Sequence, residues 1–557
     1  MRTDGDGDGY TPDPRRWRAL SVCLVGGFMA LLDVSIVNVA LPSIREGLHA
    51  SDSALQWVVS GYALAFGLLL VPAGRFGDMH GRRNAFVAGV TLFTLASAAA
   101  GAAQGALWLV VARVIQGAAG GIINPQISGL IQQLFRGAER GRAFGMLGAT
   151  VGISTAVGPL IGGLLIQAAG VAEGWRWVFY VNIPIGALAI FLAYRFIPKF
   201  CDEDRRQESF DPVGVALLAF GMVLVLLPLI QEQAWVGQGK WLLLAGGVAV
   251  LAGFVMWERS YGRSGRHPMV DLGLFRRRSY TLGALLGLAY FGGFTAIFFI
   301  FTLYLQQGLH YTALQAGIAT LPFALGSAVS ASLGGRVVVR VGRALIAVGL
   351  VLVLVGLIGV EIAVELVPGR NDGFATALPL LIAGIGSGLV IAPNQTLTLA
   401  EVPVVGAGSA GGVLQTGQRI GAAVGIAVVG AVFFNSIAGS GGDFAKAFRD
   451  GLWVTIGFVV ISLVIALADV RASRRARTAA IPPGAHRAPD PDSPAQAREP
   501  GSSGSPGSYG SAAAPGAASP GPRRWELRPA VPDPGMFGPG AAGKASSGQD
   551  LGFEHTS

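Results

Sequence analysis

The first long apolar stretch of the chain, "ALSVCLVGGFMALLDVSIVNVAL" at 19–41, decides the fold class. A helix crosses the apolar core of a bilayer with about 20 residues, and this stretch is long enough. Stretches at 54–73 and 85–104 reach the same length, and the pattern continues to about residue 470. With 52% hydrophobic and only 13% charged residues, the 557-residue chain is too apolar for a soluble globular protein. We therefore expect an all-α polytopic membrane protein.

Windows of low charge predict fourteen transmembrane helices. They lie near 18–41, 54–73, 84–104, 107–134, 143–169, 176–196, 212–231, 241–258, 280–304, 313–333, 344–364, 376–400, 406–435 and 452–470. With a cytoplasmic N-terminus, the inner loops carry 27 Lys or Arg, counted through Arg477, and the outer loops carry six. This asymmetry follows the positive-inside rule. It predicts a multi-pass protein of the cell (inner) membrane with both termini in the cytoplasm.

Charge and composition argue against several other classes of protein. The net charge of +9 is explained by topology and by anionic lipid headgroups, so it predicts no nucleic-acid partner. Only Cys23 and Cys201 occur, which provides no disulfide framework. The histidines fall in predicted loops or in the tail, and no phosphate-binding loop is present. We therefore expect no metal, no cofactor and no enzymatic activity.

Two similar strings predict an internal repeat. "GRFGDMHGR" at 74–82 matches "GRVVVRVGR" at 335–343 in two glycines and two arginines. Transporters are commonly built from such repeats, so helices 1–6 should correspond to helices 9–14, with helices 7 and 8 inserted. The predicted parts are an N-terminal cytoplasmic segment (1–17), a six-helix bundle (18–196), a linker with the inserted helices (197–279), a second six-helix bundle (280–470) and a tail (471–557). The tail is rich in Pro, Gly, Ser and Ala, which predicts a disordered cytoplasmic segment, either passive or regulatory.

Five motifs in a fixed order carry a family resemblance. They are "LLDVSIVNVALP" at 31–42, "GRFGDMHGRR" at 74–83, "RVIQGAAGG" at 113–121, "GPLIGGLL" at 158–165 and "WRWVFYVNIPIG" at 175–186. Over about 17–470 the chain resembles the major facilitator superfamily, and within it the fourteen-helix drug:proton antiporters of the EmrB/QacA type. The resemblance implies a major facilitator fold, with two six-helix halves plus two inserted helices.

The resemblance also implies a function. The expected protein is a proton-coupled secondary active exporter of hydrophobic or cationic small molecules, such as drugs or antibiotics, that works by alternating access. Its partners would be a small-molecule substrate, protons and the lipid bilayer, and it would function as a monomer. An exporter or uptake carrier dedicated to one endogenous metabolite, peptide or lipid is an alternative. A membrane receptor or scaffold without transport is a third, against which the intramembrane charges of Asp33 and Arg113 argue.

The loop between helices 2 and 3 resembles the family's signature loop. The matching residues are Gly74, Asp78, Gly81, Arg82 and Arg83, whereas Met79 replaces the usual arginine. Glycines permit a tight turn, and an acidic group among arginines can brace neighbouring helix ends. We expect this segment to form a gating loop at the cytoplasmic face. A basic loop that only fixes the topology is the alternative.

Asp33 and Arg113 are the predicted proton-coupling residues. A carboxylate inside an apolar span is costly, and burial disfavours its anion, which makes Asp33 a candidate proton-binding group. In the resembled family the matching residues of helices 1 and 4 are implicated in coupling. From a rise of about 1.5 Å per residue, the two lie roughly 12 Å and 9 Å from the outer ends of their spans, at similar depths. A structural carboxylate and an arginine that only reaches the outer headgroups are the alternatives.

Helix 5 carries a glycine-rich run that resembles the antiporter signature of the family, which is associated with export. Its residues are Gly158, Pro159, Gly162 and Gly163. Small residues let helices approach closely, and a proline can kink a helix. Close packing without any meaning for direction is the alternative.

Further polar residues inside the predicted spans are candidate substrate contacts. They are Asn38, Gln116, Asn124, Gln126, Asn394, Gln395 and Arg419, with Trp57, Tyr62, Phe66, Tyr290, Phe294 and Phe298 as apolar lining. Such side chains either face a cavity or bond across helices, so interhelical contacts are the alternative. Glu361 is the candidate ion-pair partner of Arg419.

Overall fold

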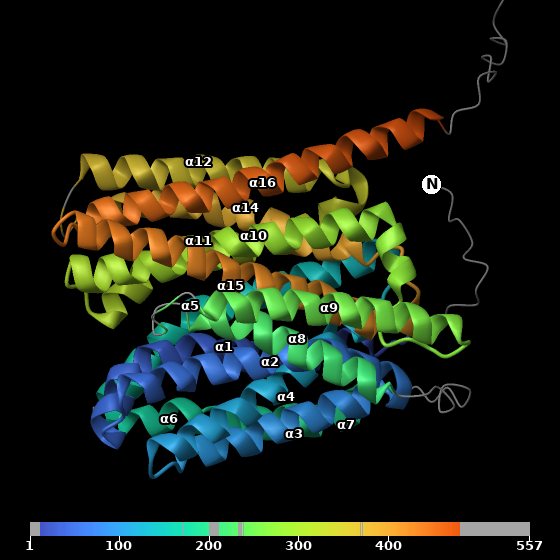
Figure 1. Cartoon of the computed structure of the whole chain (residues 1–557), viewed down its shortest axis with the longest axis horizontal. Coiled ribbons are helices and arrows are strands. Elements are labelled where there is room, and N and C mark those ends of the chain that lie inside the picture. Colours follow the sequence, from blue (N-terminus) through green and yellow to red (C-terminus); the bar gives the residue numbers. More distant parts are fainter. Residues whose placement is uncertain are drawn as a thin grey trace, which may run out of the picture. The chain divides into compact units, whose positions relative to one another are not determined.

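The computed structural model is built from long α-helices (Figure 1). It describes residues 12–479 apart from 171, 200–210, 232–234, 236, 238, 368 and 370. Within these residues, fourteen helical spans are long and apolar enough to cross a membrane. The expected all-α polytopic fold is therefore confirmed, and so is its number of spans.

The helices extend beyond most of the apolar windows from which they were predicted. The spans are α1 (Arg16–Leu48), α2 (Asp52–His80), α3 (Arg82–Gly101), α4 (Ala106–Leu134), α5 (Gly137–Ala169), α6 (Gly174–Tyr180) with α7 (Asn182–Phe196), α8 (Pro212–Ile230), α9 (Gly239–Arg263), α10 (Arg278–Leu303), α11 (Ala313–Val341), α12 (Ala344–Leu366), α14 (Ala377–Thr398), α15 (Ala407–Gly439) and α16 (Phe444–Ala479). A short helix, α13 (Asp372–Ala375), precedes α14. The additional residues at the helix ends include charged ones that the low-charge windows left out. They are helical because helix propensity does not depend on hydropathy.

The predicted start of the C-terminal tail differs from the structure. Helix α16 runs to Ala479, so the residues from 471 to 479 are helical and the predicted disordered tail does not begin at 471. Arginines at 471, 474, 475 and 477 are good helix formers, which explains the continuation. The remainder of the tail, from 480, lies outside the described residues.

Helix contacts repeat between the two halves. In the first half α2 packs against α4, and α1 packs against α5. Their counterparts after the inserted helices, α11 with α14 and α10 with α15, pack in the same way. The halves meet where α2 packs against α15 and where α5 packs against α11. These two interfaces are equivalent, because α11 is the counterpart of α2 and α15 is the counterpart of α5. This pattern is that of two related six-helix halves.

The inserted pair lies against the junction of the halves. Helix α8 packs against both α2 and α15, and α9 packs against α8 (Figure 1). Asp211 caps α8 by accepting a hydrogen bond from the Gly214 backbone N–H at 3.0 Å, and Pro212 occupies the first turn. Met222 and Leu226 of α8 belong to one buried cluster with residues of α2 and α15. The insert therefore touches one of the two interfaces between the halves.

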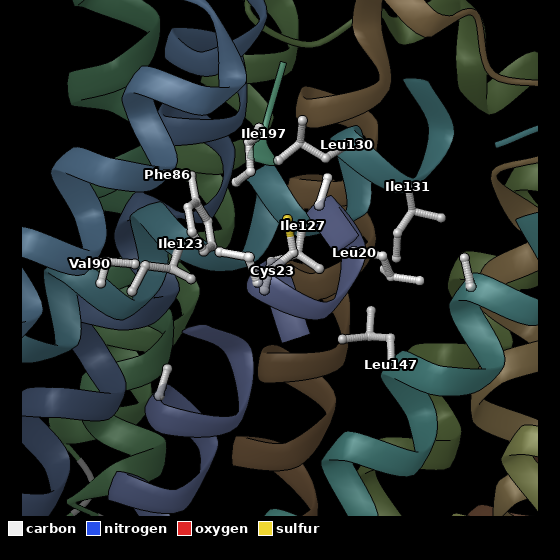
Figure 2. Packing of buried hydrophobic residues seen from close by; sticks show 14 of the residues in the cluster. Leu20, Cys23, Phe86, Val90, Ile123, Ile127, Leu130, Ile131, Leu147 and Ile197 are labelled. Carbon is white, nitrogen blue, oxygen red and sulfur yellow. The ribbon is translucent and has the colours of Figure 1, made fainter. Parts of the chain in front are cut away.

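The two largest buried clusters are centred on the two halves, and the first also includes Tyr280, Ala410 and Leu414 of the second half. Figure 2 shows part of the cluster in the first half, where Cys23 of α1 lies among Phe86, Ile123 and Ile127 of neighbouring helices. The second half has its own cluster around α10, α12 and α16. Most of the buried apolar side chains of each half therefore pack against other residues of the same half.

Close approach between the halves depends on glycine. A Cβ added at Gly412 of α15 would lie 2.5 Å from the carbonyl oxygen of Leu70 on α2 and 3.1 Å from Cα of Val71. Both neighbours are backbone atoms, which cannot move aside as a side chain can. The α2–α15 interface therefore has no room for a larger residue at this position.

We predict that Gly412→Val destabilises the protein by about 1–3 kcal/mol, because it forces α2 and α15 apart. The measurement is the midpoint of thermal unfolding of the purified protein in detergent. Gly417→Val is the matched control, since it changes the same helix at a glycine with nothing within 4 Å of an added Cβ. Equal losses in the two variants would contradict the packing argument.

Candidate proton-coupling and gating sites

Asp33 of α1 and Arg113 of α4 form an ion pair inside the first half. The Arg113 Nη1 group donates to Asp33 Oδ2 at 2.5 Å, and Arg113 Nε donates to the carbonyl oxygen of Val58 at 3.1 Å. The two side chains are 0% and 2% exposed. Buried charges are tolerated when they are paired and hydrogen-bonded. The structure thus brings together the two residues that the sequence places at similar depths.

Further polar side chains complete the surroundings of Asp33. Gln116 Nε2 donates to Asp33 Oδ1 at 2.8 Å and to Ser97 Oγ at 2.6 Å. Asn182 Nδ2 donates to Asp33 Oδ1 at 3.1 Å, and Gln116 Oε1 accepts from Arg113 Nη1 at 2.7 Å. These side chains are all buried. Gln116, a candidate substrate contact by sequence, therefore lies in the network that holds the carboxylate.

Asn182 and Ser97 are the members of this network that the sequence did not single out. Asn182 begins α7, just after the break at Val181 that divides the sixth span into α6 and α7. It lies within the family motif at 175–186, and an amide in an otherwise apolar run was the available signal. Ser97 gave no signal, because serine is common in membrane helices.

A cavity of about 50 Å³ lies beside the ion pair, between α1, α2, α4 and α15. It is lined by Val34, Val37, Asn38, Val59, Tyr62, Ala63, Phe66, Arg113 and Arg419. The Arg113 guanidinium lies 4.3 Å from the Tyr62 ring centre, and that of Arg419 lies 4.3 Å from the Phe66 ring centre. The two rings are stacked with their centres 6.1 Å apart. Asn38 and Arg419, both predicted from sequence, thus face one cavity with two predicted aromatic residues.

The predicted ion pair between Arg419 and Glu361 is wrong. Glu361 instead accepts from Arg449 Nε at 2.8 Å, and Arg449 also bridges to Glu365 at 3.2 Å. The reason is lateral placement: α12 packs against α14 and α16, so Glu361 meets an arginine of α16. Depth along a span does not determine which helix lies next to it.

Asp78 of the predicted gating loop connects the two halves. Its Oδ1 accepts from the Gly408 backbone N–H at 3.1 Å, and its Oδ2 accepts from the Ser409 backbone N–H at 2.9 Å and from Ser409 Oγ at 3.0 Å. Both donors lie in the first turn of α15, where backbone N–H groups are free and the helix dipole favours an anion. The carboxylate therefore acts as a cap on a helix of the opposite half.

Arg82 extends this link. Its Nη2 donates to Asp78 Oδ1 at 2.7 Å and to the carbonyl oxygen of Val404 in the second half at 2.5 Å, while Nη1 donates to that of Gly129 at 2.6 Å. One buried arginine thus holds α2, α4 and the segment before α15 together. The charge pattern predicts that this end of the protein is cytoplasmic, and these hydrogen bonds join the two halves there.

The other members of the gating loop have local roles. Gly81 forms the turn between α2 and α3 with φ of +96°, a conformation that favours glycine. Gly74 lies where α15 comes closest, with an added Cβ 2.5 Å from the carbonyl oxygen of Gly408. Arg83 points away from this interface and donates to the Ile197 carbonyl oxygen at 3.4 Å. The loop thus divides into a part between the halves and a part within the first half.

The glycine-rich run of α5 is divided between two neighbours. Added Cβ atoms at Gly158 and Gly162 would lie 1.9 Å from Ser35 Oγ and 2.9 Å from Ile36 Cγ1, so both glycines let α5 approach α1. Pro159 instead contacts Gly317 of α11 in the second half, and Gly163 has nothing within 4 Å of an added Cβ. The run therefore supports packing beside Asp33, and its link to transport direction stays a prediction.

The remaining candidate substrate contacts mostly bond across or along helices. Gln126 Nε2 donates to the Ala73 carbonyl oxygen at 2.8 Å, Asn394 Nδ2 to that of Gly283 at 3.0 Å, and Asn124 Nδ2 to that of Gly120 in its own helix at 3.2 Å. Gln395 is half-buried on α14. For Gln126 and Asn394 the alternative of interhelical contacts fits the structure better than a substrate site.

Comparisons with known proteins give a consistent result. The family model described as Major Facilitator Superfamily matches residues 23–426. The "Probable actinorhodin transporter" of Streptomyces coelicolor is 37% identical over 77% of this chain and 75% of its own length. The "Puromycin resistance protein pur8" of Streptomyces alboniger is 34% identical over 76% of this chain and 82% of its own. The crystal structure of human MFSD10 (TETRAN) shares the fold with a TM-score of 0.60 at 14% identity, over 82% of this chain and 100% of that one.

We predict that Asp78→Ala opens the closed end, because it removes every hydrogen bond between Asp78 and the first turn of α15. The reporter is Ser128→Cys, at a buried position on α4 that contacts Gln415 of α15. In a background with Cys23 and Cys201 replaced, a water-soluble maleimide should label the reporter severalfold faster in the Asp78→Ala protein. The control is Asp271→Ala, an exposed aspartate whose hydrogen bond to the Gly273 N–H is local. If Asp78→Ala leaves the labelling rate at the control value, Asp78 does not keep this end closed.

Proposed function

This chain belongs to the Major Facilitator Superfamily, and we propose that it exports hydrophobic small molecules, such as drugs or antibiotics, in exchange for protons. The observation that carries the proposal is the fully buried carboxylate of Asp33, held by Arg113, Gln116 and Asn182 beside a cavity. Relatives named for antibiotic transport and resistance support the class of substrate. We place the protein in the cell membrane as a monomer with cytoplasmic termini, in accordance with the positive-inside pattern.

Asp33 is the proposed proton carrier. When a proton binds, the carboxylate loses its charge, and the ion pair with Arg113 becomes a weaker neutral hydrogen bond. Arg113 then carries an uncompensated charge at the edge of the cavity, so the balance of forces between α1, α4 and the cavity changes. Release of the proton restores the pair. This cycle gives the site two electrostatic states without any covalent chemistry.

The contacts around Asp78 and Arg82 are the proposed gate. They close the end predicted to be cytoplasmic, so the described arrangement corresponds to a state in which substrate cannot enter from that side. Export requires these bonds to break while the outer ends of the halves approach each other, as the two halves rock about the central site. Inward movement of a proton is worth about 2.3 kcal/mol per 100 mV of membrane potential, which can drive this cycle without ATP.

The proposed function is tested in everted membrane vesicles with an acid interior. We predict that addition of a transported compound from a panel of lipophilic drugs releases protons from the lumen, and that Asp33→Asn lowers this release at least about tenfold, because an amide cannot carry the proton. Asp52→Asn is the control, since Asp52 is an exposed aspartate paired with Arg45. Unchanged proton-coupled export in Asp33→Asn would remove Asp33 from the mechanism. A panel without any proton release would overturn the antiporter proposal.

A further inference from the structure

Arg419 is a cation inside the membrane part of the bundle. It lies in α15, twelve residues after Ala407, which corresponds to about 18 Å along the helix axis. The apolar core of a bilayer is about 30 Å thick, so this position is well within it. The side chain lines the cavity between α1, α2, α4 and α15. An intramembrane charge at a cavity is a functional site by default.

No described carboxylate forms an ion pair with Arg419. Its guanidinium lies over the ring of Phe66, 4.3 Å from the ring centre, and Tyr62 lines the same cavity. Two buried arginines elsewhere in the described chain form ion pairs with acidic residues: Arg113 with Asp33, and Arg82 with Asp78. Arg419 therefore differs from Arg82 and Arg113, because no described acidic side chain compensates its charge.

The charge around the cavity is positive. Asp33 has no exposed surface and does not line the cavity, where the charged residues are Arg113 and Arg419. With Asp33 ionised, its charge cancels that of Arg113, and the positive charge of Arg419 remains. Contact with a ring face compensates only part of the cost of removing a guanidinium from water. An anion would complete the site, because a guanidinium and a carboxylate form two parallel hydrogen bonds.

We propose that Arg419 binds an anionic group, such as a carboxylate, of the exported molecule, whose aromatic body stacks near Phe66 and Tyr62. This inference rests on the proposed export function and adds the charge of the preferred substrate to it. A cavity of about 50 Å³ has room for a few heavy atoms, which suits the anionic group, and the larger body is accommodated when the halves move. The family resemblance implies hydrophobic or cationic substrates, whereas the charge of this cavity favours hydrophobic substrates that carry an acid.

The test compares three probes of nearly equal size and different charge: 2-naphthoate, the neutral 2-naphthamide and the cation 2-naphthylmethylammonium. Binding to the purified full-length protein is measured by equilibrium dialysis in lipid-free detergent micelles. We expect the wild-type protein to bind naphthoate at least about tenfold more tightly than naphthamide, and the cation most weakly. Arg419→Gln should lower the affinity for naphthoate about tenfold and leave that for naphthamide unchanged.

Two further variants protect the test against a simple loss of structure. Arg419→Lys keeps the positive charge but cannot form two parallel hydrogen bonds to a carboxylate, so it should retain part of the preference for naphthoate. Arg340→Gln, which removes an exposed arginine of α11, should bind all three probes as the wild type does. Equal affinity of the wild type for the three probes, or an equal loss of all three in Arg419→Gln, would overturn the proposal. Displacement of naphthoate by added phosphatidylglycerol would assign the site to a lipid headgroup and overturn it as well.

Failure of this inference and failure of the export proposal have different signatures. Asp33→Asn should keep the preference for naphthoate in the binding assay while it loses proton-coupled export. If proton-coupled export occurs but the wild type shows no preference for the anion, only the role of Arg419 is overturned. If the preference depends on Arg419 but no compound releases protons in vesicles, only the antiporter proposal is overturned.

Discussion

The buried ion pair of Asp33 and Arg113 is accommodated within an apolar bundle because the two side chains have opposite charge and neighbouring groups add further hydrogen bonds. This constraint organises the first half of the protein. It requires α1, α3, α4 and α7 to place polar groups at one depth, and it requires α5 to approach α1 closely, which Gly158 and Gly162 permit. Loss of one partner would leave an uncompensated buried charge, at a cost of about 3–5 kcal/mol. The network is therefore structural at rest and becomes functional when a proton enters it.

The two repeats use the same loop differently. In the first repeat, Asp78 and Arg82 reach the opposite half and close the interface. In the second, Arg343 occupies the position that corresponds to Arg82, but it pairs with Asp469 and bonds to Ser279 within its own half. The second string has Arg at 340 and Val at 339 and no acidic residue. Among the described residues, this loop therefore makes polar contacts between the halves in the first repeat, whereas Arg343 of the second repeat bonds within its own half.

The sequence was sufficient for the fold because the bilayer sets the span length and the bias of loop charge, and the internal repeat relates the two halves. It also identified Asp33, Arg113 and Arg419, since a charge in an apolar span stands out. It could not show which helices lie next to one another in the bundle. Glu361 was paired with the wrong arginine because depth along a helix does not say which helices touch. Ser97 and Asn182 were missed for a related reason, because their role arises only when four helices converge on one carboxylate.

The positions of the two cavity arginines bear on how a proton and an anion can be exchanged. An anion bound by Arg113 would compete with ionised Asp33 and would be favoured once Asp33 is protonated, so proton and anion would bind together, as in a symporter. Arg419 lies on the other half of the protein, and an anion held there leaves the pair of Asp33 and Arg113 intact. Export of such an anion is also favoured by a membrane potential that is negative inside, by about 2.3 kcal/mol per 100 mV for each charge. Separate arginines for the proton site and for the anion therefore fit antiport better than one shared arginine would.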